Sequence, residues 1–114
     1  MEKILEQSLL YDFYGELLNE HQKAVYEDAV LNDLSLSEIA EERGISRQGV
    51  HDMIKRCNNT LSGYESKLHL VEKFIKTKEL VNEINTLAKE YRADGDGTKL
   101  EKIEEISNHI IENF

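Results

Sequence analysis

One short segment of the chain carries side chains that could contact nucleic acid. Cationic or hydrogen-bonding groups recur here, and they are Ser46, Arg47, Gln48, His51, Lys55 and Arg56. Arg47 and Gln48 have the side chains that form paired hydrogen bonds with base edges. Lys55 and Arg56 are better suited to phosphate groups or to a charged surface than to base reading. We take the six residues as a candidate nucleic-acid-binding site, with solvated surface charge as the alternative.

These side chains need a helix that turns them outward, and the surrounding residues predict one. Gly44 can adopt the left-handed conformation that ends one helix and opens a tight turn. Ser46 can then cap the next helix. Apolar residues recur along that helix at helical spacing, and they are Val50, Met53, Ile54, Cys57 and Leu61. The outward residues are then Arg47, Gln48, His51, Asp52, Lys55 and Asn58.

The residues before Gly44 predict a first helix packed against this one. Ser35 and Glu38 have the spacing of a capping box, which satisfies two backbone donors at a helix start. Ala40 is small where the second helix must approach closely, and Ile45 can enter the core beneath the turn. Residues 35–57 therefore predict a helix-turn-helix, whose second helix would lie in a nucleic-acid groove.

The rest of the chain is expected to be helical too, because its 114 residues include no proline and only six glycines. Asn19 with Gln22 and Thr98 with Glu101 also have capping-box spacing. A long apolar stripe is expected over residues 61–91, and Gly63 is the one candidate for an interruption of it. The further helices are expected over residues 2–18, 19 to about 32, 61–91 and 98–114, with a turn-rich loop at 92–97.

We therefore predict an all-α fold in which a helix-turn-helix domain, residues 1–62, precedes a C-terminal helical hairpin, residues 63–114. The apolar stripes of the hairpin are longer than one small domain can bury. A second copy of the chain is the simplest cover, so the C-terminal region is the expected site of homodimer formation. The alternative is that the hairpin packs back on the N-terminal helices of its own chain.

Charge is distributed unevenly along the sequence. The net charge of −9 combines −9 over residues 1–42, +3 over residues 43–60 and −3 over residues 61–114. Basic groups bind nucleic acid by displacing counterions from phosphates, and here they gather only around the candidate helix. The acidic remainder, Asp52 on that helix, and His51, which is mostly neutral at pH 7, predict weak binding.

Other chemistry has little support in the sequence. Cys57 is the single cysteine and falls on the inward face, which favours a core residue in a reducing cytoplasm over a nucleophile or a disulfide. The four histidines lack metal-ligand spacing, and the loop around Gly95 lacks the ligand series of a calcium site. No apolar run approaches the ~18 residues of a membrane span, and no signal peptide opens the chain. We expect no enzyme activity, metal, cofactor or membrane insertion.

Several segments within residues 9–72 carry a family resemblance, and they are Leu17 to Gln22, Asp33 to Glu42, Ile45 to Val50, and Leu61 to Leu68 with Tyr64 and Glu65. These segments resemble the YlxM family, small bacterial proteins with a fold similar to region 4 of sigma factors. The resemblance implies a DNA-binding or regulatory protein associated with the signal recognition particle.

Two classes of function are open at this point. The first is a regulatory protein that binds DNA or structured RNA through its helix-turn-helix. The second is an adaptor that uses the helix-turn-helix as a scaffold and offers its acidic faces to a basic protein. A protein component or the RNA of the signal recognition particle is the partner that the resemblance suggests.

Overall fold

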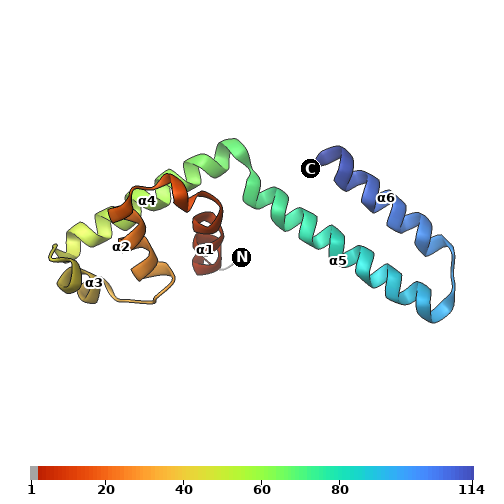
Figure 1. Ribbon diagram of the computed structural model, residues 1–114, viewed down its shortest axis with the longest axis horizontal. Helices are drawn as coiled ribbons and strands as arrows, with labels where there is room; N and C mark the ends of the chain where they lie inside the picture. The colour runs from red at the N-terminus through yellow and green to blue at the C-terminus, as the bar shows by residue number, and fades with distance from the viewer. Residues whose placement is uncertain (1–2) are drawn as a thin grey trace. The chain divides into compact units, whose positions relative to one another are not determined.

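The computed structural model describes residues 3–114, and all regular structure in that range is helical (Figure 1). The expectation of an all-α fold is therefore confirmed. The elements are α1 (Lys3–Tyr14), the short 3-10 helix η1 (Gly15–Leu17), α2 (Glu20–Val30), α3 (Leu36–Arg43), α4 (Arg47–Leu68), α5 (Leu70–Asp94) and α6 (Thr98–Asn113).

The chain forms two compact units, Met1–Val71 and Glu72–Phe114. The boundary expected after residue 62 falls inside α4, because this helix continues without a break to Leu68. The first unit holds the helix-turn-helix, and the second is the C-terminal hairpin of α5 and α6.

The start signals of α2, α3 and α4 are confirmed. The Asn19 side chain accepts a hydrogen bond from the Gln22 backbone N–H at 2.8 Å, and the Gln22 side chain accepts one in return at 3.1 Å. Ser35 forms the same reciprocal box with Glu38. Ser46 Oγ accepts from the Gly49 N–H at 2.9 Å. These bonds satisfy donors that a helix start leaves open.

Gly44 ends α3 in the left-handed conformation, with φ +66° and ψ 33°. Beneath this turn, Val25, Ile39 and Val50 of α2, α3 and α4 are fully buried together. Ala40 and Ile45 pack against them, as the sequence predicts. The three helices therefore form one core, which fixes α4 with its inner face covered.

α1 forms a second core with α2 and α4. Leu10, Tyr14, Tyr26, Cys57 and Leu61 are buried there. The single helix expected over residues 2–18 is wrong in its extent: within the described residues, α1 ends at Tyr14 and η1 follows.

The buried Gly15 follows the end of α1 directly. A Cβ atom on this residue would lie 2.7 Å from the Tyr11 ring, so any larger residue here would force that ring to shift.

The long helix expected over residues 61–91 is also interrupted, at His69 rather than at Gly63. His69 has a left-handed backbone, with φ 54° and ψ 29°, and separates α4 from α5. The Tyr14 hydroxyl accepts from the Leu70 N–H at 3.1 Å, and Glu65 accepts from the Val71 N–H at 3.0 Å. Packing against α1 thus holds the break, while Gly63 lies inside α4.

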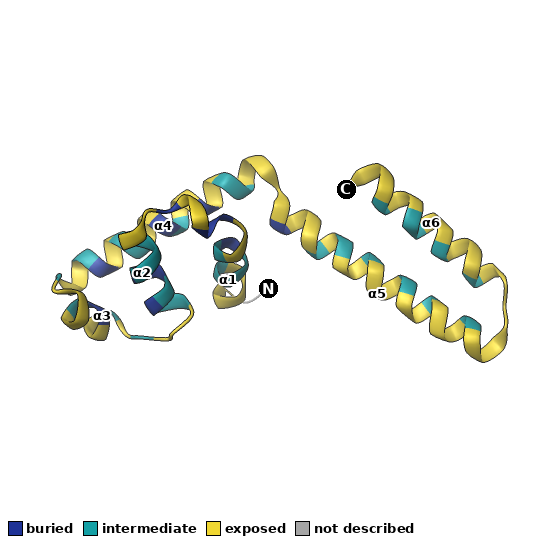
Figure 2. Ribbon diagram, viewed as in Figure 1, coloured by how far each residue is buried: buried dark blue, intermediate teal, exposed yellow. Residues whose placement is uncertain are grey.

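The C-terminal unit is a hairpin formed by most of α5 and all of α6, and no residue over 72–114 is buried (Figure 2). Val71, near the start of α5, is buried and belongs to the first unit. Apolar residues along both helices are half-buried, and they are Ile75, Leu80, Ile84, Leu87, Tyr91, Ile103, Ile106 and Ile110. None of the helices over residues 3–114 has the length and apolar content that crossing a membrane requires.

The start of α6 differs from the expected capping box of Thr98 with Glu101. Asp96 Oδ1 accepts both from the Thr98 backbone N–H at 3.0 Å and from the Thr98 hydroxyl at 2.8 Å. Thr98 is the first residue of α6, so its hydroxyl bonds back to the loop instead of capping the helix. Asp96 thus satisfies the first N–H of α6 from the loop, whereas Gly97, the N-cap residue, forms no side-chain cap bond.

Candidate nucleic-acid interface

The outer face of α4 carries most of the candidate side chains. Arg47, Gln48, His51 and Lys55 are all exposed. Arg47, His51 and Lys55 are spaced four residues apart and therefore lie along one strip of the helix. Ser46 lies at the start of this strip, where its Oγ is engaged in capping α4.

A shallow hollow of about 420 Å³ lies at the start of the strip. Leu36 at the start of α3 and Arg47, Gln48 and His51 of α4 line it. A second hollow, of about 390 Å³, continues from His51 and is also lined by Lys55. Because His51 borders both, the hollows follow α4 from its first turn onward.

Arg56 does not belong to this strip. It is exposed, but it lies nine positions after Arg47 and therefore about half a turn around the helix, since each residue advances about 100°. The structure thus brings Arg47, Gln48, His51 and Lys55 together and places Arg56 on another side of α4.

Asp52 puts a negative charge among the candidate residues. Its Oδ1 accepts a hydrogen bond from Gln48 Nε2 at 3.0 Å and lies 3.5 Å from His51 Nδ1. Hydrogen bonds from Gln48 and then from His51 lower the pKa of Asp52, so the carboxylate is ionised at neutral pH. The bond uses one N–H of Gln48 and leaves its Oε1 and second N–H for a base edge.

Arg43, directly before the turn glycine, has a structural partner. Its Nε and Nη2 donate to Asp28 Oδ2 at 3.1 and 2.8 Å. Asp28 is only 6% exposed, so its charge needs this partner. The pair gives Arg43 a structural role, and it removes one cation from the basic segment.

Asn58 was expected to point outward, and this expectation is wrong. Its side chain is half-buried, and its Oδ1 accepts from Gln7 Nε2 at 3.1 Å and from the Tyr26 hydroxyl at 2.5 Å. α1 and α2 meet α4 at this point. Lys3 and Gln7, which are not among the residues that the sequence predicts for the site, also line the second hollow. Their i, i+4 spacing places both on one face of α1, but only the packing shows that this face meets α4.

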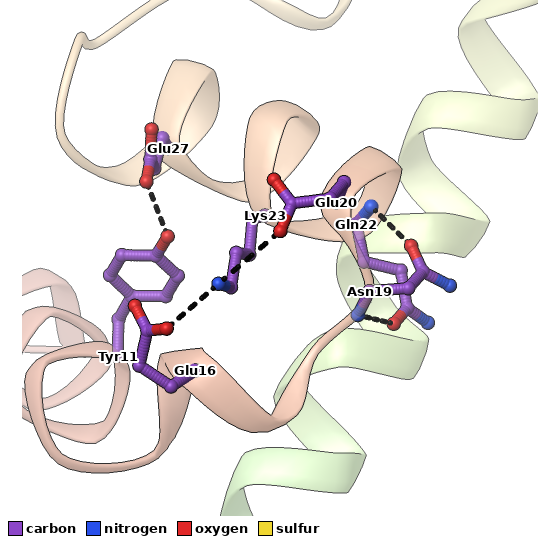
Figure 3. Close-up of polar contacts among 7 residues, drawn as sticks. All are labelled: Tyr11, Glu16, Asn19, Glu20, Gln22, Lys23 and Glu27. Atoms are coloured by element: carbon purple, nitrogen blue, oxygen red, sulfur yellow. Dashed lines mark hydrogen bonds and ion pairs between the residues drawn. The ribbon is translucent and has the colours of Figure 1, made fainter.

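Acidic side chains, in contrast, gather on α1, η1 and α2 (Figure 3). Lys23 Nζ lies 3.1 Å from Glu16 and 3.7 Å from Glu20, whose side chains are 94% and 95% exposed. The Tyr11 hydroxyl donates to Glu27 at 2.5 Å. One lysine is thus shared by two carboxylates, and this surface remains acidic.

Little in the described chain suggests catalytic or metal chemistry. Burial raises the pKa of the Cys57 thiol, so the group stays protonated inside the core. No group of three or more His, Cys, Asp or Glu side chains within residues 3–114 is arranged to hold a metal ion.

The fold and the exposed α4 strip define the class: a small all-α helix-turn-helix protein. Residues 1–106 match the family described as "Putative helix-turn-helix protein, YlxM / p13 like", and the chain belongs to this family.

The curated relatives described here match three quarters or more of the chain. A UPF0122 protein of Acetivibrio thermocellus is 40% identical over 117 residues, covering 99% of this chain and 100% of the relative. A second UPF0122 protein, from Clostridium novyi, is 44% identical over 98% of both chains. UPF0122 protein YlxM of Bacillus subtilis is 46% identical over 77% of this chain and 80% of its own length.

Proposed function

We propose that this protein binds DNA or structured RNA through the outer strip of α4 and acts as a regulatory protein of the cytoplasm rather than as an enzyme. One observation carries the proposal. The helix that a helix-turn-helix offers to a groove exposes Arg47, Gln48 and Lys55 side by side, in a protein that is otherwise acidic. The binding is weak, because few cations contribute and the acidic surfaces repel phosphates.

Retention of a labelled DNA duplex and of an RNA stem-loop at low salt tests the proposal. Wild-type protein should retain at least one of them, and Arg47→Ala with Lys55→Ala should abolish retention without changing the melting temperature. Lys67→Ala is the matched control, since Lys67 is an exposed cation of α4 that does not line the strip. Equal loss in the control would show that only overall charge matters.

We further propose that two copies associate through the C-terminal hairpin. No residue of α6 is buried, while Ile111 is 75% exposed and Leu100 is 44% exposed. Exposed side chains of this size favour a partner surface over water. A dimer would offer two α4 helices to one nucleic acid, which compensates for the weak binding of each.

A second candidate function rests on the acidic surface of α1, η1 and α2, where Glu16 and Glu20 are almost fully exposed. Such a surface suits a basic protein partner. The resemblance that the sequence carries suggests a component of the signal recognition particle. A pull-down from cell extract with and without nuclease separates the two candidates: a partner that resists nuclease supports the adaptor, and one that is lost supports nucleic-acid binding.

A further inference from the structure

We propose that the hollow between α1 and α4 binds a phosphodiester group of the nucleic-acid backbone, as a second contact beside the α4 strip. This inference rests on the proposed function and adds a site that the helix-turn-helix motif itself does not include. Two helices far apart in the sequence line the hollow, α1 with Lys3 and Gln7 and α4 with Lys55 and Asn58. It has a volume of about 390 Å³.

The charges in the hollow suit a phosphate. Lys3 and Lys55 lie on separate helices, each carries an ammonium group, and both line the same hollow. Lysine binds phosphate as a point charge and needs no fixed orientation, so exposed lysines at the rim are sufficient. Half or more of the hydrogen bonds to DNA go to phosphate and sugar, from cationic, amide and hydroxyl side chains such as these.

Asn58 lines the same hollow as the two lysines, and the oxygen of its side-chain amide already has two partners. Its Oδ1 already accepts from Gln7 Nε2 and from the Tyr26 hydroxyl, so the amide must point its Nδ2 away from both. Tyr26 is fully buried, and burial raises its pKa to about 12, which keeps the phenol a donor. The Asn58 N–H groups are therefore oriented before any ligand arrives, and less entropy is lost on binding.

The hollow continues the strip along α4. His51 lines both the first hollow, with Arg47 and Gln48, and the second, with Lys55. Asn58 lies eleven positions after Arg47, which is roughly 16 Å along a helix. One phosphate cannot contact both residues, so we expect the two regions to contact different nucleotides.

An acidic residue limits the site. Glu6 lines an adjoining hollow of about 260 Å³ together with Lys3, Lys55 and Asn58. Its carboxylate would repel a phosphate bound there. The phosphodiester is therefore expected at the His51 end, away from Glu6, and removal of the Glu6 charge should strengthen binding.

Three variants test the site with the same DNA duplex and RNA stem-loop, titrated over a range of salt concentrations. Lys3→Ala should weaken binding and lower the salt slope by about one counterion. Asn58→Asp keeps an oxygen for Tyr26 and Gln7 but replaces the amide donor with a negative charge, and it should weaken binding as well. Glu6→Gln should strengthen it. Lys67→Ala, which changes charge elsewhere on α4, should leave the affinity nearly unchanged.

The outcomes separate this site from the α4 strip. If Arg47→Ala abolishes binding while Lys3→Ala and Asn58→Asp leave affinity and salt slope unchanged, the second site is wrong and the proposed function stands. If wild-type protein retains neither probe at low salt, both are wrong. Melting curves show whether Asn58→Asp is folded; if it is not, Lys3→Ala and Glu6→Gln decide the question alone.

Discussion

At the residue scale, Gly44 shows how one backbone angle permits the whole motif. Its φ of +66° lies in the region that side chains with a Cβ avoid, although no atom lies near where that Cβ would be. Gly44→Val should therefore lower the free energy of unfolding by more than ~1 kcal/mol through backbone strain alone. Urea unfolding measures this value.

The control for that substitution is Gly63→Ala, in the interior of α4 with open space around it. It should raise stability by about 0.5–1 kcal/mol, as alanine does in helices. An equal destabilisation by both variants would contradict the role assigned to the left-handed turn.

The ion pair between Arg43 and Asp28 makes a second residue-scale prediction. Removing the guanidinium leaves a carboxylate that is only 6% exposed without its partner. Arg43→Ala should cost about 1–3 kcal/mol of stability. Arg56→Ala removes an exposed cation from a helix of the same unit and should change stability by less than about 0.5 kcal/mol. If thermal melts show equal effects, the pair does not stabilise the fold.

At the scale of elements, the sequence is sufficient to predict a helix start where side chains close to that start bond its free backbone N–H groups. Ser35 with Glu38 and Asn19 with Gln22 could be predicted because each box closes within four residues. The role of Asp96 could not be predicted, because the turn-rich loop at 92–97 does not show which side chain accepts from the first N–H of α6.

The break at His69 and the inward position of Asn58 depend on contacts with α1, more than 50 positions away. Such contacts leave no periodic signal in the sequence. For the same reason the outward strip of α4 could be predicted from helical spacing, while the hollow that α1 forms with it could not.

The junction of α4 and α5 gives an element-scale prediction. The Tyr14 hydroxyl accepts from the Leu70 N–H and donates to Glu65 at 2.5 Å, and only 1% of Tyr14 is exposed. Tyr14→Phe keeps the ring and removes these bonds, so it should cost about 1 kcal/mol. Amide exchange at Leu70 should speed up, while exchange at Val50 should follow only the change in global stability. Unchanged exchange at Leu70 would show that the hydroxyl does not hold the junction.

At the scale of the whole molecule, the apolar residues of the hairpin predict self-association. Ile111→Lys should shift the protein from dimer to monomer in sedimentation at micromolar concentration, because a charge there opposes burial. Ile111 is 75% exposed within the chain, so helix content should not fall. Asn108→Lys makes the same addition of charge at an exposed polar position of α6 and should leave the dimer intact. A wild-type protein that sediments as a monomer would contradict the dimer.

The distribution of charge over the molecule provides the most direct test of nucleic-acid binding. Asp52 places a negative charge beside Gln48 and His51 on the outer strip of α4. Asp52→Lys reverses that charge and releases the Gln48 amide. Position 52 and Gln48 are both exposed, so the fold should not be disturbed. Affinity for the DNA duplex or the RNA stem-loop should rise, and the salt slope should increase by about one to two counterions. If wild-type protein retains neither probe at low salt and Asp52→Lys changes nothing, α4 does not bind nucleic acid.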